Sequence, residues 1–235
     1  MNLLCLDSGN TRVKWGLRLG ETWLAKGACP IDGLAELAVS AGRLLACNVA
    51  GAVAQAAIES LAARLDAKLD WVRSEATAFG VINGYEHPQQ LGADRWAALI
   101  GAHVLHSGTC LVVNAGTATT VDVLGSDGRF RGGLILPGIS MMRQVLAANT
   151  ADLPVATGNY RELPKNTVDA IASGALEATL GAIERMFDPI AAEPNALCLL
   201  SGGAASALLP HLKIAYRLIP DLVLEGLGTI ADQIS

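Results

Sequence analysis

A short turn motif occurs twice in this chain, and the repetition constrains the fold more than any other feature of the sequence. The first copy, residues 3–16, is an apolar segment, an acid followed by small polar residues and glycine, and a segment of alternating apolar and polar residues. The second copy, residues 111–123, repeats this order with Asn114 where the first has Asp7. Alternation with a period of two is typical of a β-strand, so each copy predicts a β-hairpin with a polar turn.

The rest of the chain alternates predicted strands with predicted helices, which favours an α/β fold. Buried strands are expected at residues 44–49, 69–72, 130–136 and 197–200, and helices at 53–65, 94–106, 139–148 and 168–187, with a last helix starting near Leu227. We predict loops at residues 79–90 and 153–164, and we expect the second loop to act as a lid. We therefore expect two duplicated halves, residues 1–105 and 106–235, that face one phosphate chain.

Composition and charge exclude several classes of protein. Hydrophobic residues make up 51% of the chain and charged residues 17%, which is typical of a globular protein. The chain has no apolar run long enough to span a membrane, and its start lacks the basic segment of a signal peptide. The net charge is −5 and no Lys/Arg cluster occurs, so no nucleic-acid partner is expected. An odd number of cysteines without a CxxC motif indicates a reducing, cytoplasmic location.

The first turn has the residues of a phosphate site. Gly9 lets backbone N–H groups approach an anion, and Lys14 can neutralise a phosphate oxygen. A carboxylate does not face phosphate unaided, so Asp7 suggests Mg²⁺, bound directly or through water. Further side-chain donors come from Ser8, Asn10 and Thr11. The alternative, which an isolated motif of this type would favour, is an Asx turn in which Asp7 only satisfies its own backbone.

The second turn offers a weaker version of the same site. Thr117 follows Gly116 and is expected to contact phosphate. We interpret Thr119 and Thr120 as ordinary strand residues that face solvent or core. The alternative is that they are further ligand contacts. Asp122 is predicted to point away from the apolar face of its strand, where it could act as a second carboxylate near a metal.

Residues 92–95, Gly-Ala-Asp-Arg, form a different kind of candidate site at the start of a predicted helix. Arg95 can bind a carboxylate through two parallel hydrogen bonds, and Asp94 can accept a proton from a substrate hydroxyl. The alternative is that Asp94 caps the helix and that Arg95 is solvated.

Taken in order, these motifs resemble those of the type III pantothenate kinases, which belong to the acetate kinase, sugar kinase, Hsp70 and actin superfamily and are related to the Bvg accessory factor proteins. The resemblance covers nearly the whole chain. It rests on the motifs at 7–14, 92–95, 114–120 and 132–138, on Tyr85, on Leu153–Pro154, and on Asn166–Thr167 before Ala170–Ile171 and Gly174.

The resemblance implies two actin-like, ribonuclease H-like halves with mixed sheets and an ATP site in the cleft between them. It implies ATP-dependent phosphorylation of pantothenate to 4′-phosphopantothenate, the first step of coenzyme A synthesis, by a cytoplasmic homodimer that uses Mg²⁺. In-line phosphoryl transfer needs positioning, charge neutralisation and a base, which agrees with the residue types found here.

The resemblance also assigns roles to individual residues. It makes Asp94 the general base. The ATP contacts would be Asp7, Ser8, Gly9, Asn10, Thr11, Arg12, Val13, Lys14 and Thr117. Pantothenate would be held by Tyr85, Gly92, Ala93, Asp94, Arg95 and, from the other subunit of the dimer, Thr167.

One position departs from the family pattern. The family commonly has an aspartate at the start of the second turn as a ligand for K⁺ or NH₄⁺, and this chain has Asn114. An amide oxygen brings no charge, so we expect a weak dependence on a monovalent cation or none.

Two other functions fit the same residues less well. One is an actin-like kinase or phosphatase for another small hydroxy acid or sugar, although a neutral sugar would give Arg95 no carboxylate to bind. The other is a regulatory protein that keeps the ATP fold, against which the intact Asp94 argues.

Overall fold

The computed structural model describes residues 2–150 and 158–234, and the chain forms two compact units. Unit 1 comprises Met1–Ser107, Ser126–Phe130 and Asp221–Ser235, and unit 2 comprises Gly108–Gly125 and Arg131–Pro220. The Leu153–Pro154 pair, and with it the first part of the predicted lid, lies outside the described residues.

Strands and helices follow one another along the chain in the order that the motifs predict, with short 3₁₀ turns η1–η3 between them. In chain order the elements are β1 (Leu3–Ser8), β2 (Val13–Leu19), β3 (Thr22–Cys29), η1 (Asp32–Glu36), β4 (Arg43–Asn48), α1 (Ala52–Arg64), β5 (Lys68–Trp71), β6 (Thr77–Ala78), β7 (Val81–Ile82), η2 (Pro88–Gln90), α2 (Ala93–Leu105), β8 (Cys110–Ala115), β9 (Ala118–Leu124), β10 (Phe130–Pro137), α3 (Ile139–Asn149), α4 (Thr167–Phe187), η3 (Asp188–Ile190), β11 (Leu197–Ser201), α5 (Ala205–Leu208), β12 (Tyr216–Leu218) and α6 (Leu222–Gln233).

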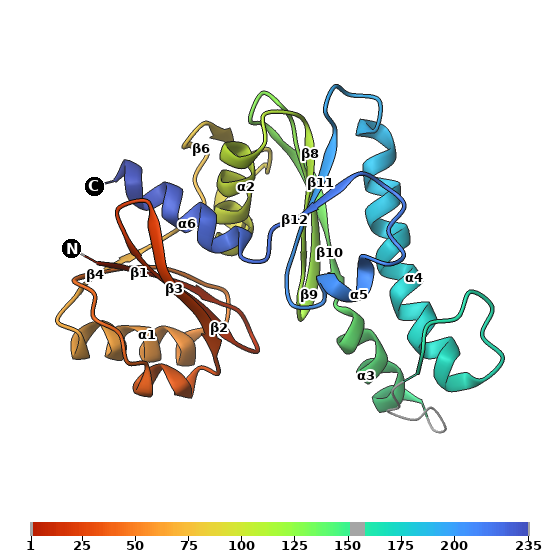
Figure 1. Ribbon diagram of the computed structural model, residues 1–235, viewed down its shortest axis with the longest axis horizontal. Helices are drawn as coiled ribbons and strands as arrows, with labels where there is room; N and C mark the ends of the chain where they lie inside the picture. The colour runs from red at the N-terminus through yellow and green to blue at the C-terminus, as the bar shows by residue number, and fades with distance from the viewer. Residues whose placement is uncertain (1, 151–157, 235) are drawn as a thin grey trace. The chain divides into compact units, whose positions relative to one another are not determined.

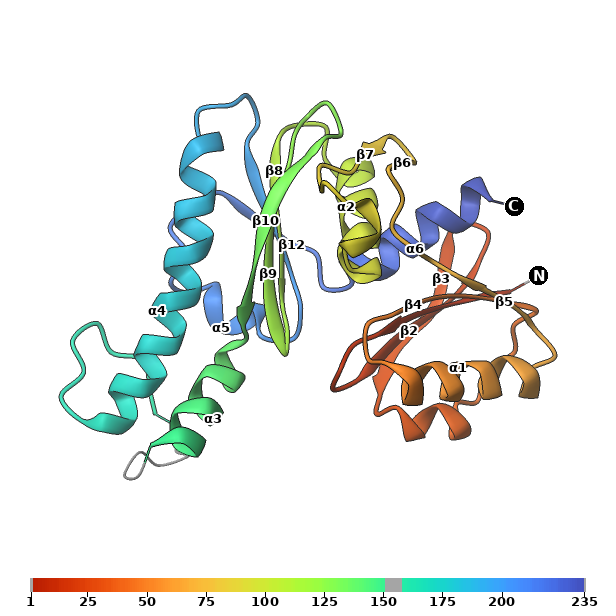
Figure 2. The same ribbon diagram turned by 180° about the vertical axis from the view of Figure 1, so that it is seen from behind.

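Unit 1 is a five-stranded mixed sheet with helices on both faces (Figures 1 and 2). Its strand order is β3-β2-β1-β4-β5, with β1 antiparallel to β2 and parallel to β4. One face packs on α1 through a core that includes Leu4, Leu44, Ile58 and Leu61. Helices α2 and α6 cover the other face, because strands β1 and β4 bury apolar side chains on both sides.

Unit 2 has a sheet of the same design. Its strand order is β10-β9-β8-β11-β12, with β8 antiparallel to β9 and parallel to β11. Helix α4 lies along one face of this sheet (Figure 1) and buries Leu180, Ile183 and Phe187 against Leu111 and Val113. The apolar residues of α4 recur every three or four positions, which is the spacing that such packing requires.

The two sheets are equivalent strand by strand. Asp7 in β1 lies opposite Lys14 in β2 and Cys47 in β4. Asn114 in β8 lies opposite Thr120 in β9 and Ser201 in β11. The equivalence places Asn114 in the position of Asp7, as the repeated turn motif predicted, and confirms the α/β fold with two mixed sheets.

The C-terminal segment does not stay with the second half of the chain. Residues 106–235 were expected to form one half, but residues 221–235 belong to unit 1, where α6 packs along α2. This packing needs glycine on both helices, because a Cβ on Gly226 would collide with the carbonyl oxygen of Ala97, and one on Gly101 would lie 2.8 Å from the amide nitrogen of Gly226. The sequence pattern does not indicate that residues 221–235 pack against the first half of the chain.

Two boundaries differ from the sequence predictions. Helix α6 begins at Leu222 rather than near Leu227, because Gly226 and Gly228, which interrupt the apolar pattern, are helical and closely packed. The expected loop at residues 79–90 is in part ordered, since β6 and β7 form a small antiparallel pair at Thr77–Ile82 that extends into it.

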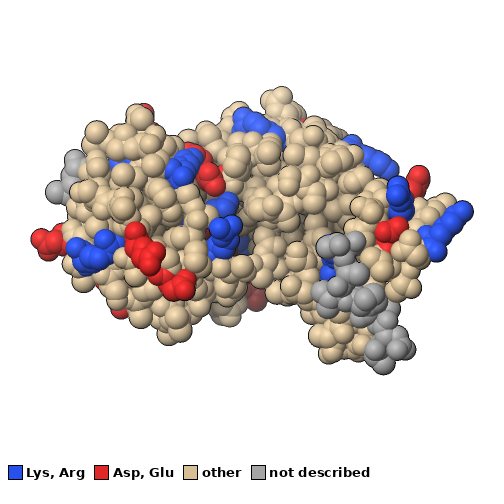
Figure 3. All heavy atoms as spheres, turned by 60° about the horizontal axis from the view of Figure 1, so that its bottom comes forward, with Lys and Arg blue, Asp and Glu red and all other residues tan. Residues whose placement is uncertain are grey.

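Charged side chains do not gather on the face of the molecule shown in Figure 3. Lysine, arginine and acidic residues lie there in small groups separated by uncharged surface. Among the described residues, no helix combines the length and apolar character needed to cross a membrane.

Candidate active site

Strands β1 and β2 place Asp7 and Lys14 on the same face of the unit 1 sheet. The two residues lie directly opposite each other in an antiparallel ladder, where facing side chains are neighbours. The turn between them is closed by a hydrogen bond of 3.2 Å from the Gly9 N–H to the carbonyl oxygen of Arg12. Asn10, Thr11 and Arg12 are exposed at its tip. The turn therefore presents donors to solvent next to a carboxylate and an ammonium group.

Ser8 ends β1 with a buried hydroxyl group. The residue is 0% exposed, and its Oγ has no hydrogen-bond partner among the described residues. A buried hydroxyl without a partner costs free energy, on the order of 1–3 kcal/mol. Because successive residues of a strand point to opposite faces of the sheet, this hydroxyl lies on the face opposite Asp7 and Lys14.

Asp7 is a half-buried carboxyl group with a raised pKa. Burial and then the negative charge of Asp94 raise the pKa of Asp7 to about 6, while a hydrogen bond from the Cys47 thiol at 3.5 Å and the charge of Lys14 act in the opposite direction. At neutral pH such a carboxylate is ionised and poorly compensated. It therefore has the character of a ligand for a divalent cation.

Asp94 lies in the first turn of α2, one residue after the helix begins. Its Oδ1 accepts a hydrogen bond of 2.8 Å from the Arg95 amide, and Gly92 is close enough that a Cβ there would lie 2.6 Å from the same oxygen. Burial raises the pKa of Asp94 above its ordinary value, against the lowering effect of Arg95. The result is a carboxylate more basic than a solvated aspartate.

Arg95 is buried rather than solvated, which rules out the alternative left open by the sequence. It is 5% exposed, and its Nη1 donates a hydrogen bond of 2.8 Å to the Tyr85 hydroxyl oxygen. The guanidinium carbon lies 5.5 Å from the centre of the Tyr85 ring and 5.8 Å from that of Phe130. The structure thus brings together Tyr85 and the 92–95 motif, which the family resemblance assigns to one substrate site.

A polar hollow of about 510 Å³ adjoins this motif in unit 1. Gly92 and Ala93 form part of its wall, and polar side chains supply much of the rest: Asn48, Gln55, Arg73, Ser74, Gln89 and Gln90. A volume of this size is typical of a small-molecule site.

The remaining predicted site residues lie in unit 2. Asn114 is half-buried in the centre of its sheet, and the Thr117 carbonyl accepts a hydrogen bond of 2.9 Å from the Gly138 amide. Thr167 is the first residue of α4, and the N-cap is Asn166, whose side chain accepts a hydrogen bond from the Asp169 amide.

The strand-borne residues of the second turn are buried, which for the threonines is the core-facing alternative. Thr119 and Thr120 are 0% and 9% exposed, so both face the interior. Asp122 is 1% exposed and lies against Gly133 of β10, where a Cβ would collide with its carboxyl group. No group of three or more His, Cys, Asp or Glu side chains suited to a metal ion occurs in the part of the chain that the structure describes.

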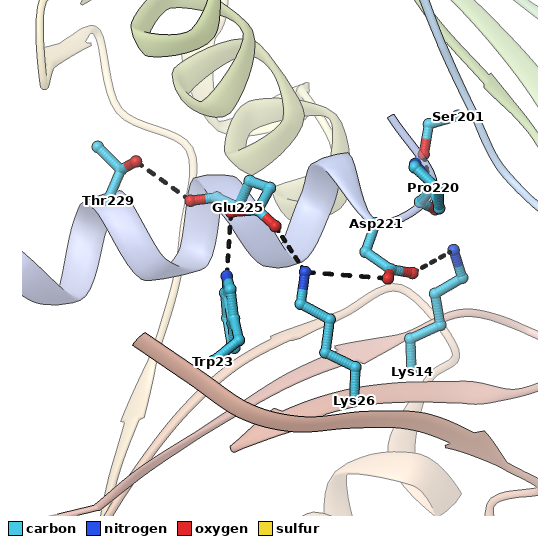
Figure 4. Close-up of polar contacts among 8 residues, drawn as sticks. All are labelled: Lys14, Trp23, Lys26, Ser201, Pro220, Asp221, Glu225 and Thr229. Carbon is cyan, nitrogen blue, oxygen red and sulfur yellow. Dashed lines mark hydrogen bonds and ion pairs between the residues drawn. The ribbon is translucent and has the colours of Figure 1, made fainter. Parts of the chain in front are cut away.

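The sequence interpretation missed two residues near Asp7. One is Cys47, the thiol donor to Asp7; it was correctly predicted to be buried, but its register beside β1 was not predictable. The other is Asp221, whose Oδ1 lies 3.3 Å from the Lys14 ammonium nitrogen (Figure 4). Asp221 precedes an apolar run, which is a signal for a helix N-cap. The signal was missed because the last helix was predicted to start near Leu227.

Two equivalent mixed sheets with this strand order define the class of proteins that share the actin-like fold. Solved structures support the fold. A protein described as a Baf family transcriptional activator from Campylobacter jejuni superposes with a TM-score of 0.69 at 20% identity, covering 98% of each chain. MreB5 of Spiroplasma citri bound to ADP gives a TM-score of 0.51 at 10% identity, covering 99% of this chain and 97% of the other.

Sequence comparison identifies the family within this class. The model of the type III pantothenate kinase family matches residues 3–189. The type III pantothenate kinase of Aromatoleum aromaticum is 50% identical over 235 residues, covering 97% of each chain. That of Dechloromonas aromatica is 45% identical, covering 97% of this chain and 98% of the relative. The chain belongs to the type III pantothenate kinase family.

Proposed function

We propose that this protein phosphorylates pantothenate with ATP to give 4′-phosphopantothenate, the first step of coenzyme A synthesis, and that Asp94 is the general base. Family membership supports the activity. The observation that carries the assignment of the base is the half-buried Asp94 carboxylate with a raised pKa beside the Arg95–Tyr85 pair.

Asp94 would accept the proton of the pantothenate primary hydroxyl as the γ-phosphoryl group is transferred. A general base works best when its pKa lies near the operating pH. Burial moves the pKa of Asp94 in that direction, and the charge of Arg95 keeps part of the carboxylate form. Asp94 can therefore be ionised before the reaction and still accept a proton during it.

Arg95 would bind the carboxylate of pantothenate. Its guanidinium is held by the Tyr85 hydroxyl and lies near two aromatic rings that contact each other, so little side-chain freedom is left to lose when substrate binds. Gly92 and Ala93 border the polar hollow, which has room for the rest of the substrate.

The first turn would bind the ATP phosphates through its backbone and the side chains of residues 8–14, with Thr117 as a further ATP contact. Asp7 would hold Mg²⁺, whose bound charge neutralises the phosphates during transfer. The half-buried, poorly compensated carboxylate of Asp7 fits this assignment.

We propose that the protein acts as a homodimer, with Thr167 contacting the pantothenate bound by the other subunit. Unit 2 exposes apolar side chains on β10 and α3, including Ile135 at 64% and Val145 at 51%. An apolar hollow of about 360 Å³ lies beside them, between α3 and α4. Apolar surface of this kind is what an obligate interface covers. A cytoplasmic location agrees with five free cysteines.

A coupled assay of ADP release with pantothenate and Mg·ATP tests the proposal. Wild type should release ADP only when pantothenate is present, and Asp94→Asn should lose nearly all of this activity. Release that is independent of pantothenate, or a fully active variant, would contradict it.

A further inference from the structure

Within unit 1, lysines of β2 and β3 and acidic residues at the start of α6 form a row of alternating charges (Figure 4). The Lys14 ammonium nitrogen lies 3.3 Å from Asp221 Oδ1, and that of Lys26 lies 4.0 Å from Asp221 Oδ2. Lys26 also lies 2.6 Å from Glu225 Oε1, and Trp23 donates a hydrogen bond of 3.1 Å to the other oxygen of Glu225. Each carboxylate oxygen of Asp221 therefore faces a lysine.

Asp221 stands at the N-cap of α6 but does not cap it. Its side chain makes no hydrogen bond to the first turn of the helix. Asn166, at the N-cap of α4, does bond the backbone N–H of Asp169, at 2.8 Å. An aspartate at an N-cap normally accepts such a bond. In α6 the carboxylate is instead directed to Lys14 and Lys26.

Helix α6, which begins directly after Asp221, is anchored to other elements of unit 1. Gly226 of the same helix touches the backbone of α2 at Ala97, where no larger residue fits. Near the other end of α6, Asp232 accepts a hydrogen bond of 3.0 Å from Arg18 of β2. A carboxylate on such an anchored helix can restrain a long flexible side chain.

Lys14 is the side chain that benefits from this restraint. It lies opposite Asp7, and the charges of Lys14 and Asp221 both reach the Asp7 carboxyl group. A free lysine has many rotamers to lose when it binds phosphate, whereas an ammonium group with three donors can keep Asp221 and add a phosphate oxygen.

We infer that Asp221 is a positioning residue that holds the Lys14 ammonium group beside Asp7 in readiness for the phosphates of ATP. The inference rests on the proposed function and adds the C-terminal helix to the nucleotide site.

Charge alone predicts the opposite effect. Asp221 is an anion near the place proposed for a polyanion, so removing its charge should strengthen ATP binding if Lys14 were not involved. Weaker binding in Asp221→Asn therefore separates positioning from simple repulsion. Asparagine is as good an N-cap residue as aspartate, so the start of α6 should survive the change.

The experiment measures the dissociation constant of Mg·ATP by calorimetry on the full chain, together with the KM for ATP and kcat. In Asp221→Asn the dissociation constant and KM should rise about three- to tenfold, the effect of ordering one long side chain on binding, with a smaller change in kcat. Asp221→Glu should recover part of the loss. Glu36→Gln removes one negative charge at an exposed position of unit 1, in η1, and should leave nucleotide affinity unchanged.

The Lys14→Met background shows whether Asp221 acts through Lys14. There, adding Asp221→Asn should not weaken binding further. Unchanged or tighter ATP binding in Asp221→Asn, or an equal loss in both backgrounds, would overturn the inference. A wild type that binds Mg·ATP without phosphorylating pantothenate would refute the proposed function, and the binding comparison would still decide the role of Asp221.

Discussion

Arg95 donates a hydrogen bond from Nη1 to the hydroxyl oxygen of Tyr85 at 2.8 Å, in surroundings that leave the arginine 5% exposed. Tyr85→Phe removes this acceptor and keeps the ring. Because a hydrogen bond to a charged group contributes about 1.5–3 kcal/mol, kcat/KM for pantothenate should fall about ten- to a hundredfold. Most of the loss should appear in KM for pantothenate, with KM for ATP unchanged.

Tyr216→Phe is the matched control for this change. Tyr216 is 42% exposed on β12, so its hydroxyl group is available to water. The control should have wild-type kinetics. If Tyr85→Phe were also indistinguishable from wild type, the role of Arg95 in binding the substrate carboxylate would be refuted.

The pH dependence of kcat/KM should report the raised pKa of Asp94. Asp7, whose pKa is about 6, contributes to the same acidic limb because its carboxylate form is the one that would hold Mg²⁺. The active form of Asp94 is also the carboxylate, so kcat/KM should rise with pH through the pKa of Asp94 as well. Burial raises that pKa, so the midpoint of the acidic limb should lie above the ordinary value of about 3.9 for an aspartate. Circular dichroism across the same range shows whether unfolding intrudes. A profile that is flat down to the ordinary value while the protein stays folded would contradict the assignment.

Asn114 should make the enzyme insensitive to K⁺. An amide oxygen supplies no negative charge, so replacing NaCl by KCl at constant ionic strength should change turnover by less than about twofold. Asn114→Asp introduces a carboxylate at the position equivalent to Asp7 and should create saturable activation by K⁺. Strong K⁺ activation of wild type would show that the amide is sufficient.

The exposed apolar face of unit 2 should be a subunit interface. Ile135→Glu places a charge on this face, and sedimentation should show a shift from dimer to monomer with loss of activity, because Thr167 would no longer reach the substrate of the other subunit. Val53→Glu on α1 of unit 1, where the valine is 75% exposed, should leave a dimer. A monomeric wild type, or a dimeric Ile135→Glu, would contradict the proposal.

The sequence predicted the features that depend on short-range pattern. Alternation identified the two hairpins, and the repeated turn identified Asn114 as the counterpart of Asp7, which the equivalent strand registers confirm. The 92–95 motif was placed correctly at the start of a helix. These features follow from residues close together in the chain.

Features set by contacts between distant segments were not predictable. The thiol of Cys47 meets Asp7 only because β4 pairs with β1 in one register. Asp221 reaches Lys14 only because α6 returns to unit 1, on glycines that look like helix breakers in the sequence. Burial of Arg95 likewise depends on Tyr85 and Phe130, the second of which lies in a separate segment of unit 1.

Asp94→Asn tests the central claim most directly. Burial raises the pKa of Asp94 in the folded state, so its charge lowers stability as pH rises through the interval from the unfolded to the folded pKa. The asparagine variant should therefore be at least as stable as wild type at neutral pH, while keeping its affinity for Mg·ATP. The account predicts that this folded, nucleotide-binding variant loses at least about a hundredfold in kcat for pantothenate phosphorylation. Wild-type kcat in the same variant would contradict it.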